Sequence, residues 1–352
     1  MSTIIRIIFR AVHQFGLIEL FFVFFIIINI LTFLLYMLDK QKAVKSKRRI
    51  RESTLIFFTL VCGGIGAFLG FYFFKHKKNK LKFKISIGTG FIITLIPIIH
   101  MVHSLTLDEM IRYEEIEFFS ENWPVELDGY RIAFMTDKHT ITDEAMAEVV
   151  TELNGRNLDL LLLGGDFSSD VFRGGTFYQG TIREIAQTNT TDGIFGVDGN
   201  HDYYARLFHA KEQYGIIPLD NSGMYIREGF YLAGVQDLWR RNPNIADAIA
   251  GANTDDFILL LSHNPDVSMQ QSTIGIDLIL SGHTHGGQIT FFGYPFYLLR
   301  GSISDYGTYF THGFVRCSDE VSVFVSRGVG VYYAWPRIFA RPEVIIFTMY
   351  SE

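Results

Sequence analysis

The first hundred residues consist of long apolar runs separated by short basic loops. The run from Gly16 to Leu38 contains one charged residue, Glu19, and is long enough to cross a hydrocarbon core of about 30 Å as a helix. A second run, Ile85 to Val102, contains Pro97, which membrane helices tolerate when neighbouring groups bond the freed carbonyl. A cleaved signal peptide is the alternative for the first run, but no small-residue cleavage site follows it. The pattern predicts an all-α transmembrane region over residues 1–104.

The apolar stretch between these runs, Ser53 to Phe74, is interrupted by glycines and flanked on both sides by Lys and Arg clusters. A straight span would place the two basic clusters on opposite sides of the membrane, although short basic loops tend to stay cytoplasmic. A re-entrant hairpin that turns at the glycines keeps both clusters on the cytoplasmic side and leaves the rest of the chain outside. A bundle of three spans packed through small residues is the alternative. We therefore expect a multi-pass protein of the cell membrane with two or three spans and an extracytoplasmic C-terminal part.

From Tyr130 onward, short apolar runs alternate with stretches of helical periodicity. Such runs are typical of strands that are buried on both faces of a sheet. The predicted strands cover 130–136, 158–163, 194–197, 230–235, 257–262, 277–280, 320–326 and 344–348, and the predicted helices cover 142–153, 181–187 and 203–214. The last part is rich in strands and poor in helices, which favours a layered α/β sandwich of two sheets flanked by helices. We assign this domain to residues 128–352 and a linker to residues 105–127.

Charge divides the chain at the same place as hydropathy. Residues up to Ser104 hold 15 Lys and Arg against 3 Asp and Glu, and the remainder holds 16 against 34, so the net charge of −6 conceals +12 and −18. The acidic, globular part would repel a phosphodiester backbone, so we expect no nucleic-acid partner. The two cysteines, Cys62 and Cys317, are too few for a disulfide framework.

Polar residues collect where five of the predicted strands end. These segments are Asp137-Lys138-His139, Gly164-Gly165-Asp166, Gly199-Asn200-His201-Asp202, Ser262-His263-Asn264 and Gly282-His283-Thr284-His285. The carboxyl ends of strands in an open α/β sheet line one crevice, so the five segments should meet there. Oxygen and imidazole ligands without thiolate suit Mn, Fe or Zn. Taken singly, each motif is an ordinary turn or a structural His. Together they predict a centre of two divalent ions that activates water and screens phosphoryl charge during phosphoester hydrolysis.

The same five motifs resemble those of calcineurin-like metallophosphoesterases, which carry D-x-H, G-D, G-N-H-D/E, a single His and G-H-x-H. The resemblance runs from about Asp128 to the C-terminus. It includes the phrases Leu261 to Asp266 and Ser326 to Gly330, which resemble a membrane-associated bacterial branch with enzymes that act on lipid-linked phosphate or pyrophosphate. The implied substrate is a phosphodiester, a phosphomonoester or a pyrophosphate, with lipid-linked forms among the candidates.

The resemblance also implies a role for each motif residue. One ion would be bound by Asp137, His139, Asp166 and His285, and the other by Asp166, Asn200, His263 and His283. His201 would lie beside the scissile phosphate, where it would either donate to an equatorial oxygen or protonate the leaving group, and Asp202 would orient the imidazole of His201. The alternatives are a membrane sensor or regulator that carries a metal-binding phosphoesterase-like domain, and a transporter regulated by such a domain. The sequence lacks the paired discontinuous helices that would support a transporter.

Three further patterns bear on location and substrate. Aromatic residues are frequent in Ile289 to Arg300 and in Val331 to Arg337, which predicts an apolar rim facing the bilayer, with packing of the far sheet as the alternative. We interpret Lys138, between two of the predicted ligands, as a solvated lysine. The first hundred residues resemble a small bacterial membrane-domain family of unknown function, which supports a membrane location only. That resemblance rests on Asp39-Lys40, Arg49 to Glu52, Gly63-Gly64, Gly66-Ala67, His76-Lys77, Lys80 and Phe83.

Overall fold

The computed structural model contains two compact units, Met1–Thr106 and Leu107–Glu352, each of which is described by itself. It describes residues 17–75, 77, 79–107, 111–139, 141–168, 176–202, 213–291, 294–295, 303–317, 319, 321–331, 337 and 340–352. The predicted helix over 203–214 therefore lies almost entirely outside the described residues.

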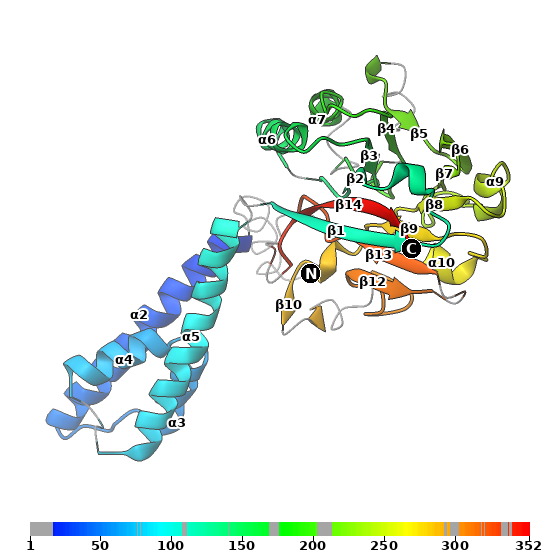
Figure 1. Ribbon diagram of the computed structural model, residues 1–352. Coiled ribbons are helices and arrows are strands. Elements are labelled where there is room, and N and C mark those ends of the chain that lie inside the picture. Colours follow the sequence, from blue (N-terminus) through cyan, green and yellow to red (C-terminus); the bar gives the residue numbers. More distant parts are fainter. Residues whose placement is uncertain are drawn as a thin grey trace. The chain divides into compact units, whose positions relative to one another are not determined.

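In its described part, from residue 17 onward, the first unit consists of four helices, α2 to α5 (Figure 1). They are α2 (Leu17–Val44), α3 (Glu52–Leu60), α4 (Gly64–Phe73) and α5 (Leu81–Leu107). The stretch from Ser53 to Phe74 is therefore not one helix. It breaks at a turn in which Cys62 has a positive φ of 59°. The side-chain amide of Asn29 holds this turn, because its Nδ2 donates to the carbonyl of Cys62 and its Oδ1 accepts from the N–H of Gly66, both at 2.9 Å. At a rise of about 1.5 Å per residue, each short helix is about 15 Å long.

Both basic loops lie at the same end of this helical unit. The buried carboxylate of Asp39, near the end of α2, pairs with Arg49 at 3.0 Å and with Lys77 at 3.5 Å. Glu52, the first residue of α3, pairs with Lys77 at 2.8 Å and also with Lys80. These contacts join the loop before α3 to the loop before α5. One straight helix between those loops would separate them by its length, so α3 and α4 turn back on each other as a helical hairpin; a re-entrant position of this hairpin in a membrane stays a prediction.

Among the described residues, one helix is long and apolar enough to cross a membrane, namely Val23–Val44. It lies within α2 and overlaps the first predicted span.

The second unit is a sandwich of two six-stranded mixed sheets, as predicted. The first sheet has the order β1-β14-β2-β3-β4-β5, and the second has the order β12-β13-β9-β8-β7-β6. The first sheet contains β1 (Arg112–Ser120), β14 (Glu343–Ser351), β2 (Tyr130–Met135), β3 (Leu160–Leu163), β4 (Ile194–Gly196) and β5 (Ile217–Pro218). The second contains β12 (Gly313–Arg316), β13 (Ser322–Val325), β9 (Leu278–Ser281), β8 (Phe257–Leu261), β7 (Phe230–Gly234) and β6 (Ser222–Arg227). A small hairpin pairs β10 (Thr290–Phe291) with β11 (Tyr294–Pro295).

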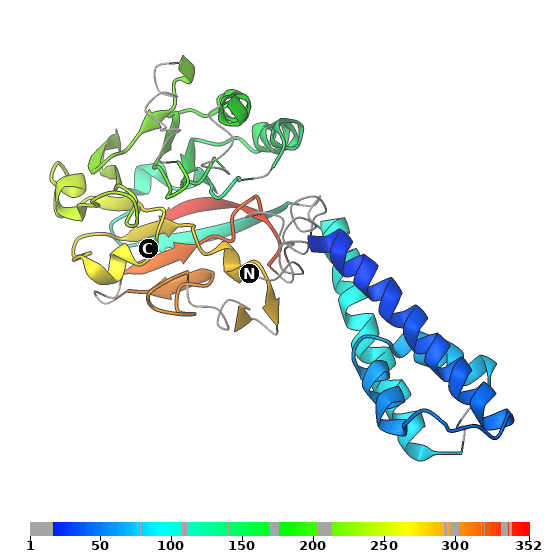
Figure 2. The same ribbon diagram turned by 180° about the vertical axis from the view of Figure 1, so that it is seen from behind.

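Helices cover the outer face of each sheet, which gives four layers (Figures 1 and 2). Helices α6 (Asp143–Asn154) and α7 (Thr176–Ile185) pack on the first sheet, and α9 (Ile245–Ile249) and α10 (Val267–Gln270) pack on the second. Successive side chains of β2 serve two cores, because Ile132 and Phe134 face the space between the sheets while Ala133 and Met135 face the helices. This alternation explains why the central strands appear in the sequence as unbroken apolar runs.

The assigned linker, residues 105–127, differs from what the structure shows. It contains β1, which pairs in parallel with β14 over its whole length, and a 3-10 turn, Val125–Leu127. Ile116 and Phe118 of β1 pack against the core between the sheets, while the intervening residues are mostly Glu. The acidic residues of this segment conceal the alternation of apolar and polar positions that is typical of an edge strand. Strand β1 belongs to the second unit.

Candidate metal centre

The five motifs lie at one edge of the sandwich, where β2, β3, β4, β8 and β9 end. Five of the predicted ligands there have a left-handed backbone, with φ between 39° and 70°: Asp137, His139, Asp166, His283 and His285. This conformation costs a non-glycine residue about 1–2 kcal/mol. Such strain clusters at functional sites, where the surrounding structure holds it in place. Two hydrogen bonds that hold it here are those from the N–H of His283 to Asp137 Oδ2 at 2.9 Å and from the N–H of His139 to the Asp166 carbonyl at 3.2 Å.

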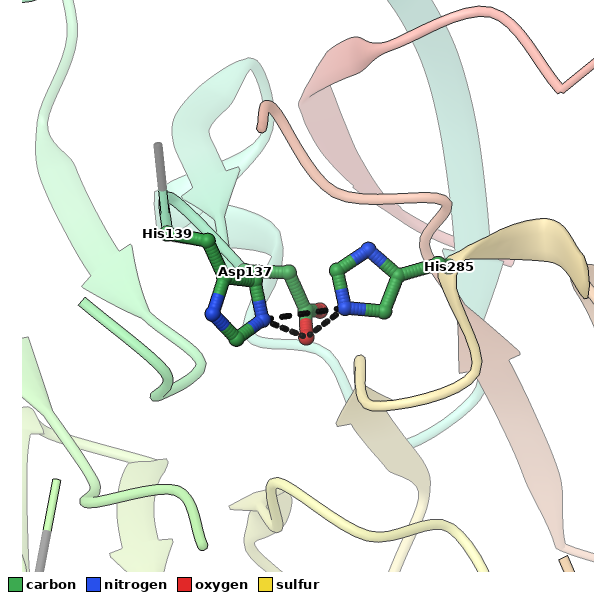
Figure 3. A group of neighbouring side chains, drawn as sticks. All are labelled: Asp137, His139 and His285. Carbon is green, nitrogen blue, oxygen red and sulfur yellow. Dashed lines mark hydrogen bonds and ion pairs between the residues drawn. The ribbon is translucent and has the colours of Figure 1, made fainter. Parts of the chain in front are cut away.

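The first group of candidate ligands consists of Asp137, His139 and His285, all buried, with ligand atoms within 4.8 Å of one another. Figure 3 shows the three side chains pointing toward one another, with the Nε2 atoms of His139 and His285 only 3.0 Å apart. The Oδ1 atom of Asp137 lies 3.2 Å from Nε2 of His285 and 3.8 Å from Nε2 of His139. Two imidazole nitrogens and a carboxylate oxygen thus surround one point, as the ligands of a metal ion do.

The second group consists of Asp166, His263 and His283, which are also buried. His263 Nε2 lies 3.2 Å from Asp166 Oδ2 and 3.3 Å from His283 Nδ1. The other ring nitrogens donate outward, from His263 Nδ1 to the Gly164 carbonyl at 2.8 Å and from His283 Nε2 to the Ile303 carbonyl at 3.2 Å. Since a carbonyl can only accept, these bonds fix the proton on the outer nitrogen and leave the inner lone pair available to a metal.

Asp166 and Asn200 complete the arrangement. Asp166 Oδ2 also lies 3.5 Å from Nε2 of His139, so this carboxylate contacts both groups. Asn200 is 6% exposed, and among the described residues its Oδ1 has no hydrogen-bond partner. An orphaned buried acceptor costs about 1–3 kcal/mol, which a cation at this position would remove. The residues therefore fit a pair of divalent ions bridged by Asp166.

Burial sets the protonation of the ligands. It lowers the pKa of His139 and of His283 to about 3, and it lowers the pKa of His285 well below its usual value, with the neighbouring His139 and Arg337 adding to the effect. These imidazoles are therefore neutral near pH 7 and can bind a metal. Burial has the opposite effect on the Asp137 carboxyl and raises its pKa to about 7, with the nearby charge of Asp166 contributing.

This shift makes metal binding depend on pH. Below about pH 7 the metal-free protein holds a proton on Asp137, and that proton must leave before the carboxylate can bind an ion. We expect the metal dissociation constant to rise at least about tenfold for each pH unit below 7, because the proton on Asp137 must leave and so must the proton on His263, whose pKa the Asp166 carboxylate raises against the effect of burial. Competition with a chromogenic chelator between pH 5.5 and 8 measures this. A dissociation constant that stays flat from pH 7 to pH 5.5 would contradict it.

His201 and Asp202 are placed differently from each other. The backbone N–H of His201 donates to Asp166 Oδ1 at 2.8 Å, and its ring packs edge-on against that of His139, with centroids 5.2 Å apart. Asp202 is fully buried, and its carboxylate accepts from the backbone N–H groups of Asp166, Phe167, Ser168 and Gly199. The expectation that Asp202 orients His201 is thus not met by these contacts. Asp202 instead ties together the two loops that carry Asp166 and Asn200.

Two basic residues also differ from expectation. Lys138 is buried rather than solvated, and burial lowers the pKa of its ammonium group to about 8. Arg337 belongs to the predicted aromatic rim, yet it is buried and donates to the carbonyls of Gly330 at 2.7 Å and His285 at 3.2 Å. Most of the two aromatic stretches lies outside the described residues, so the rim itself stays a prediction.

The segment after β7 also reaches the site, although the sequence analysis does not single it out. The ring of Trp239 lies edge-on to that of His283, with centroids 4.4 Å apart. The signal for it is the run Val235-Gln236-Asp237, a sixth strand end with a carboxylate. It resembles the other five in position but carries no His or Asn.

Two layered sheets whose strand ends hold two buried His/Asp groups are the arrangement of a metallophosphoesterase. The family model for calcineurin-like phosphoesterases matches residues 130–287, and that for a protein family of unknown function, DUF1294, matches residues 29–83. The chain belongs to the calcineurin-like phosphoesterase family, whose members are metal-dependent hydrolases.

Among curated relatives, an uncharacterized metallophosphoesterase, YkuE, of Bacillus subtilis is 28% identical, covering 69% of this chain and 86% of its own. A zebrafish (Danio rerio) transmembrane protein with metallophosphoesterase domain is 29% identical, covering 65% of this chain and 55% of its own. An uncharacterized protein of Bacillus subtilis, YpbG, is 30% identical, covering 62% of this chain and 80% of its own. The chain thus spans little more than half of the zebrafish relative.

Proposed function

We propose that this chain hydrolyses a phosphate ester or pyrophosphate at the centre formed by the two His/Asp groups. The observation that carries the proposal is that Asp166 lies within 3.5 Å of a ring nitrogen of each group, His139 Nε2 and His263 Nε2. A single carboxylate between two clusters of buried imidazoles is the arrangement that holds two divalent ions close together.

Each of the predicted site residues has a task in this proposal. One ion would be held by Asp137, His139, Asp166 and His285, and the other by Asp166, Asn200, His263 and His283. When bound, ions such as Mn, Fe or Zn supply an activated water molecule and neutralise charge on the phosphoryl group. His201, half-buried and fixed through its N–H to Asp166, would give a proton to the leaving oxygen. Burial lowers the pKa of His201, which makes that proton easier to release.

The experiment compares the rates of bis(p-nitrophenyl) phosphate hydrolysis by the purified full chain, by the chelated chain and by His285→Ala. We expect the rate of His285→Ala to be at least about a hundredfold lower, because the ion that His139 and Asp137 would also bind is held less tightly without this ligand. Adding the metal back should restore the hydrolysis rate of the chelated wild-type chain. A wild-type rate that survives chelation, or an unchanged rate in His285→Ala, would overturn the proposal.

We also propose that the helical unit anchors the enzyme in a membrane, since its surface is apolar and its interior holds polar groups. Ile27 and Ile92 are 57% and 61% exposed, whereas Thr32, Thr59 and Thr94 are fully buried and donate to carbonyls within their own helices. This is the reverse of a water-soluble bundle and suits lipid. The shared end of the unit carries exposed Lys45, Arg48, Lys75 and Lys84, which would lie at anionic head groups on the cytoplasmic side.

This anchoring proposal supports an extracytoplasmic catalytic unit and makes a lipid-linked phosphate ester a candidate substrate. Both follow from placing α2 and α5 as spans and α3–α4 as a re-entrant hairpin. The chain should remain in the membrane fraction after alkaline carbonate extraction, and protease added to intact cells should cleave the catalytic unit. Equal efficiency on lipid pyrophosphates and water-soluble esters would remove the lipid hypothesis.

A further inference from the structure

The turn that follows β7 forms a wall beside the second group of candidate ligands. Trp239 contacts His283 with the rings nearly perpendicular, at 87°, and a centroid separation of 4.4 Å. About half of the Trp239 side chain, 49%, is exposed. A large apolar ring that touches a candidate metal ligand and leaves half its surface open is available to a bound molecule.

This turn is rigidly held, although its two outermost side chains are not. Asp237 is buried, and its Oδ1 accepts from the N–H groups of Trp239 at 3.0 Å and Arg240 at 2.8 Å. Arg241, next along the chain, donates from Nη2 to Asp198 Oδ2 at 3.0 Å. A buried carboxylate and a buried ion pair thus fix the backbone on both sides of Trp239. Such support is what a binding side chain needs, because less freedom is lost when the ligand binds.

The charges beside Trp239 favour an anion. Arg240 is exposed, and its charge is one of those that lower the pKa of His201, after the larger effect of burial. A molecule whose phosphate lies at the two ligand groups would therefore have a cation and an aromatic face next to it. The acidic groups nearby, Asp137, Asp166 and Asp237, are buried and belong to the ligand groups or to the turn.

We propose that Trp239 forms a subsite that binds a flat aromatic ring attached to the substrate phosphate, either an aryl group or a nucleobase. The ring would stack on the open side of Trp239 while the phosphate occupies the site at His283 and His263. This deepens the proposed function and rests on it. The class of substrate is then a phosphate ester with a ring close to the phosphorus rather than one with only a flexible chain.

The test measures binding of three phosphate monoesters to the metal-loaded full chain by calorimetry: phenyl, hexyl and methyl phosphate. In the wild type, phenyl phosphate should bind more tightly than methyl phosphate. Trp239→Ala should reduce that preference by about threefold to tenfold, the measured range for an aromatic pair. Trp239→Phe should keep most of it. Metal content, measured in parallel, shows whether His283 is still in place.

Phe119→Ala is the matched control. Phe119 is an exposed aromatic side chain that stacks on Tyr350, and both lie where β1 and β14 end, opposite the edge that holds the site. This variant should leave the preference unchanged. The proposal is overturned if Trp239→Ala keeps the phenyl preference, or if the hexyl preference falls by the same factor, which would indicate apolar contact without stacking. If no monoester binds to the metal-loaded wild type, the proposed phosphoester site itself fails.

Discussion

Replacing Asp166 by Asn should abolish metal-dependent phosphoester hydrolysis, with a loss of at least about a thousandfold in kcat/KM, or about 4 kcal/mol of transition-state stabilisation. The carboxylate of Asp166 lies close to a ring nitrogen of each ligand group, at 3.5 Å from His139 Nε2 and 3.2 Å from His263 Nε2. Removing its charge should weaken the binding of both ions, whereas removing a ligand of one group should weaken the binding of one ion only. Steady-state kinetics at saturating metal measures the effect.

Asp255→Asn is the control for this variant, because it makes the same change of charge on an exposed residue that precedes β8, at the strand end remote from His263. It should keep the wild-type rate. The bridging role would be refuted if Asp166→Asn retained more than about a tenth of the wild-type rate with both ions still bound.

Replacing Asp202 by Ala should destabilise the protein more than it changes chemistry. The buried carboxylate accepts four backbone N–H groups, at distances from 2.6 Å to 3.3 Å. A buried hydrogen bond contributes about 0.5–1.5 kcal/mol in net terms, so the four bonds together contribute about 2–6 kcal/mol. A loss of about 3–5 kcal/mol would lower Tm by about 10 °C or more in a unit of this size. Thermal unfolding of the chelated variants measures it without the contribution of metal.

Comparison with His201→Ala separates the structural role of Asp202 from a catalytic role. The His201→Ala variant should hydrolyse the substrate more slowly while its Tm and metal content stay close to wild type, since the side chain of His201 is only half-buried. The Asp202→Ala variant should have both a lower Tm and a lower metal content, because the loops that carry Asp166 and Asn200 are no longer held together. If Asp202→Ala behaved like His201→Ala, with a lower rate at unchanged Tm, then Asp202 would act through the imidazole as the family resemblance implies.

The sequence predicts most of the fold because the spacing of apolar residues along the chain matches the residues that are buried in the structure. Strands buried on both faces appear as runs such as Leu160 to Leu163, and the glycines after Val61 mark the helical turn. Strand β1 escapes prediction because its Glu-rich edge position masks the alternation of Ile116 and Phe118. Short edge strands are decided by their partners, here β14, which follows more than two hundred residues later in the chain.

The candidate site could be predicted as a set of residues but not as a set of contacts. The strand ends bring Asp137, His139, His263, His283 and His285 together as their positions imply, since all follow strands whose carboxyl ends share an edge. The direction in which Asp202 points and the burial of Lys138 depend on loop geometry that no local pattern encodes. Trp239 follows a strand end that carries no His or Asn, and Arg337 ends a stretch predicted to form an apolar rim, so their contacts with His283 and His285 appear only in the folded chain.

Metal stoichiometry tests the central claim most directly. The full chain, purified, loaded with Mn, Fe or Zn and freed of excess ion by gel filtration, should contain two divalent ions per chain by elemental analysis. Hydrolysis of bis(p-nitrophenyl) phosphate should rise in proportion to the occupancy of the second ion. A chain that reaches its full rate with one ion, or that is active with none, would contradict a binuclear centre bridged by Asp166.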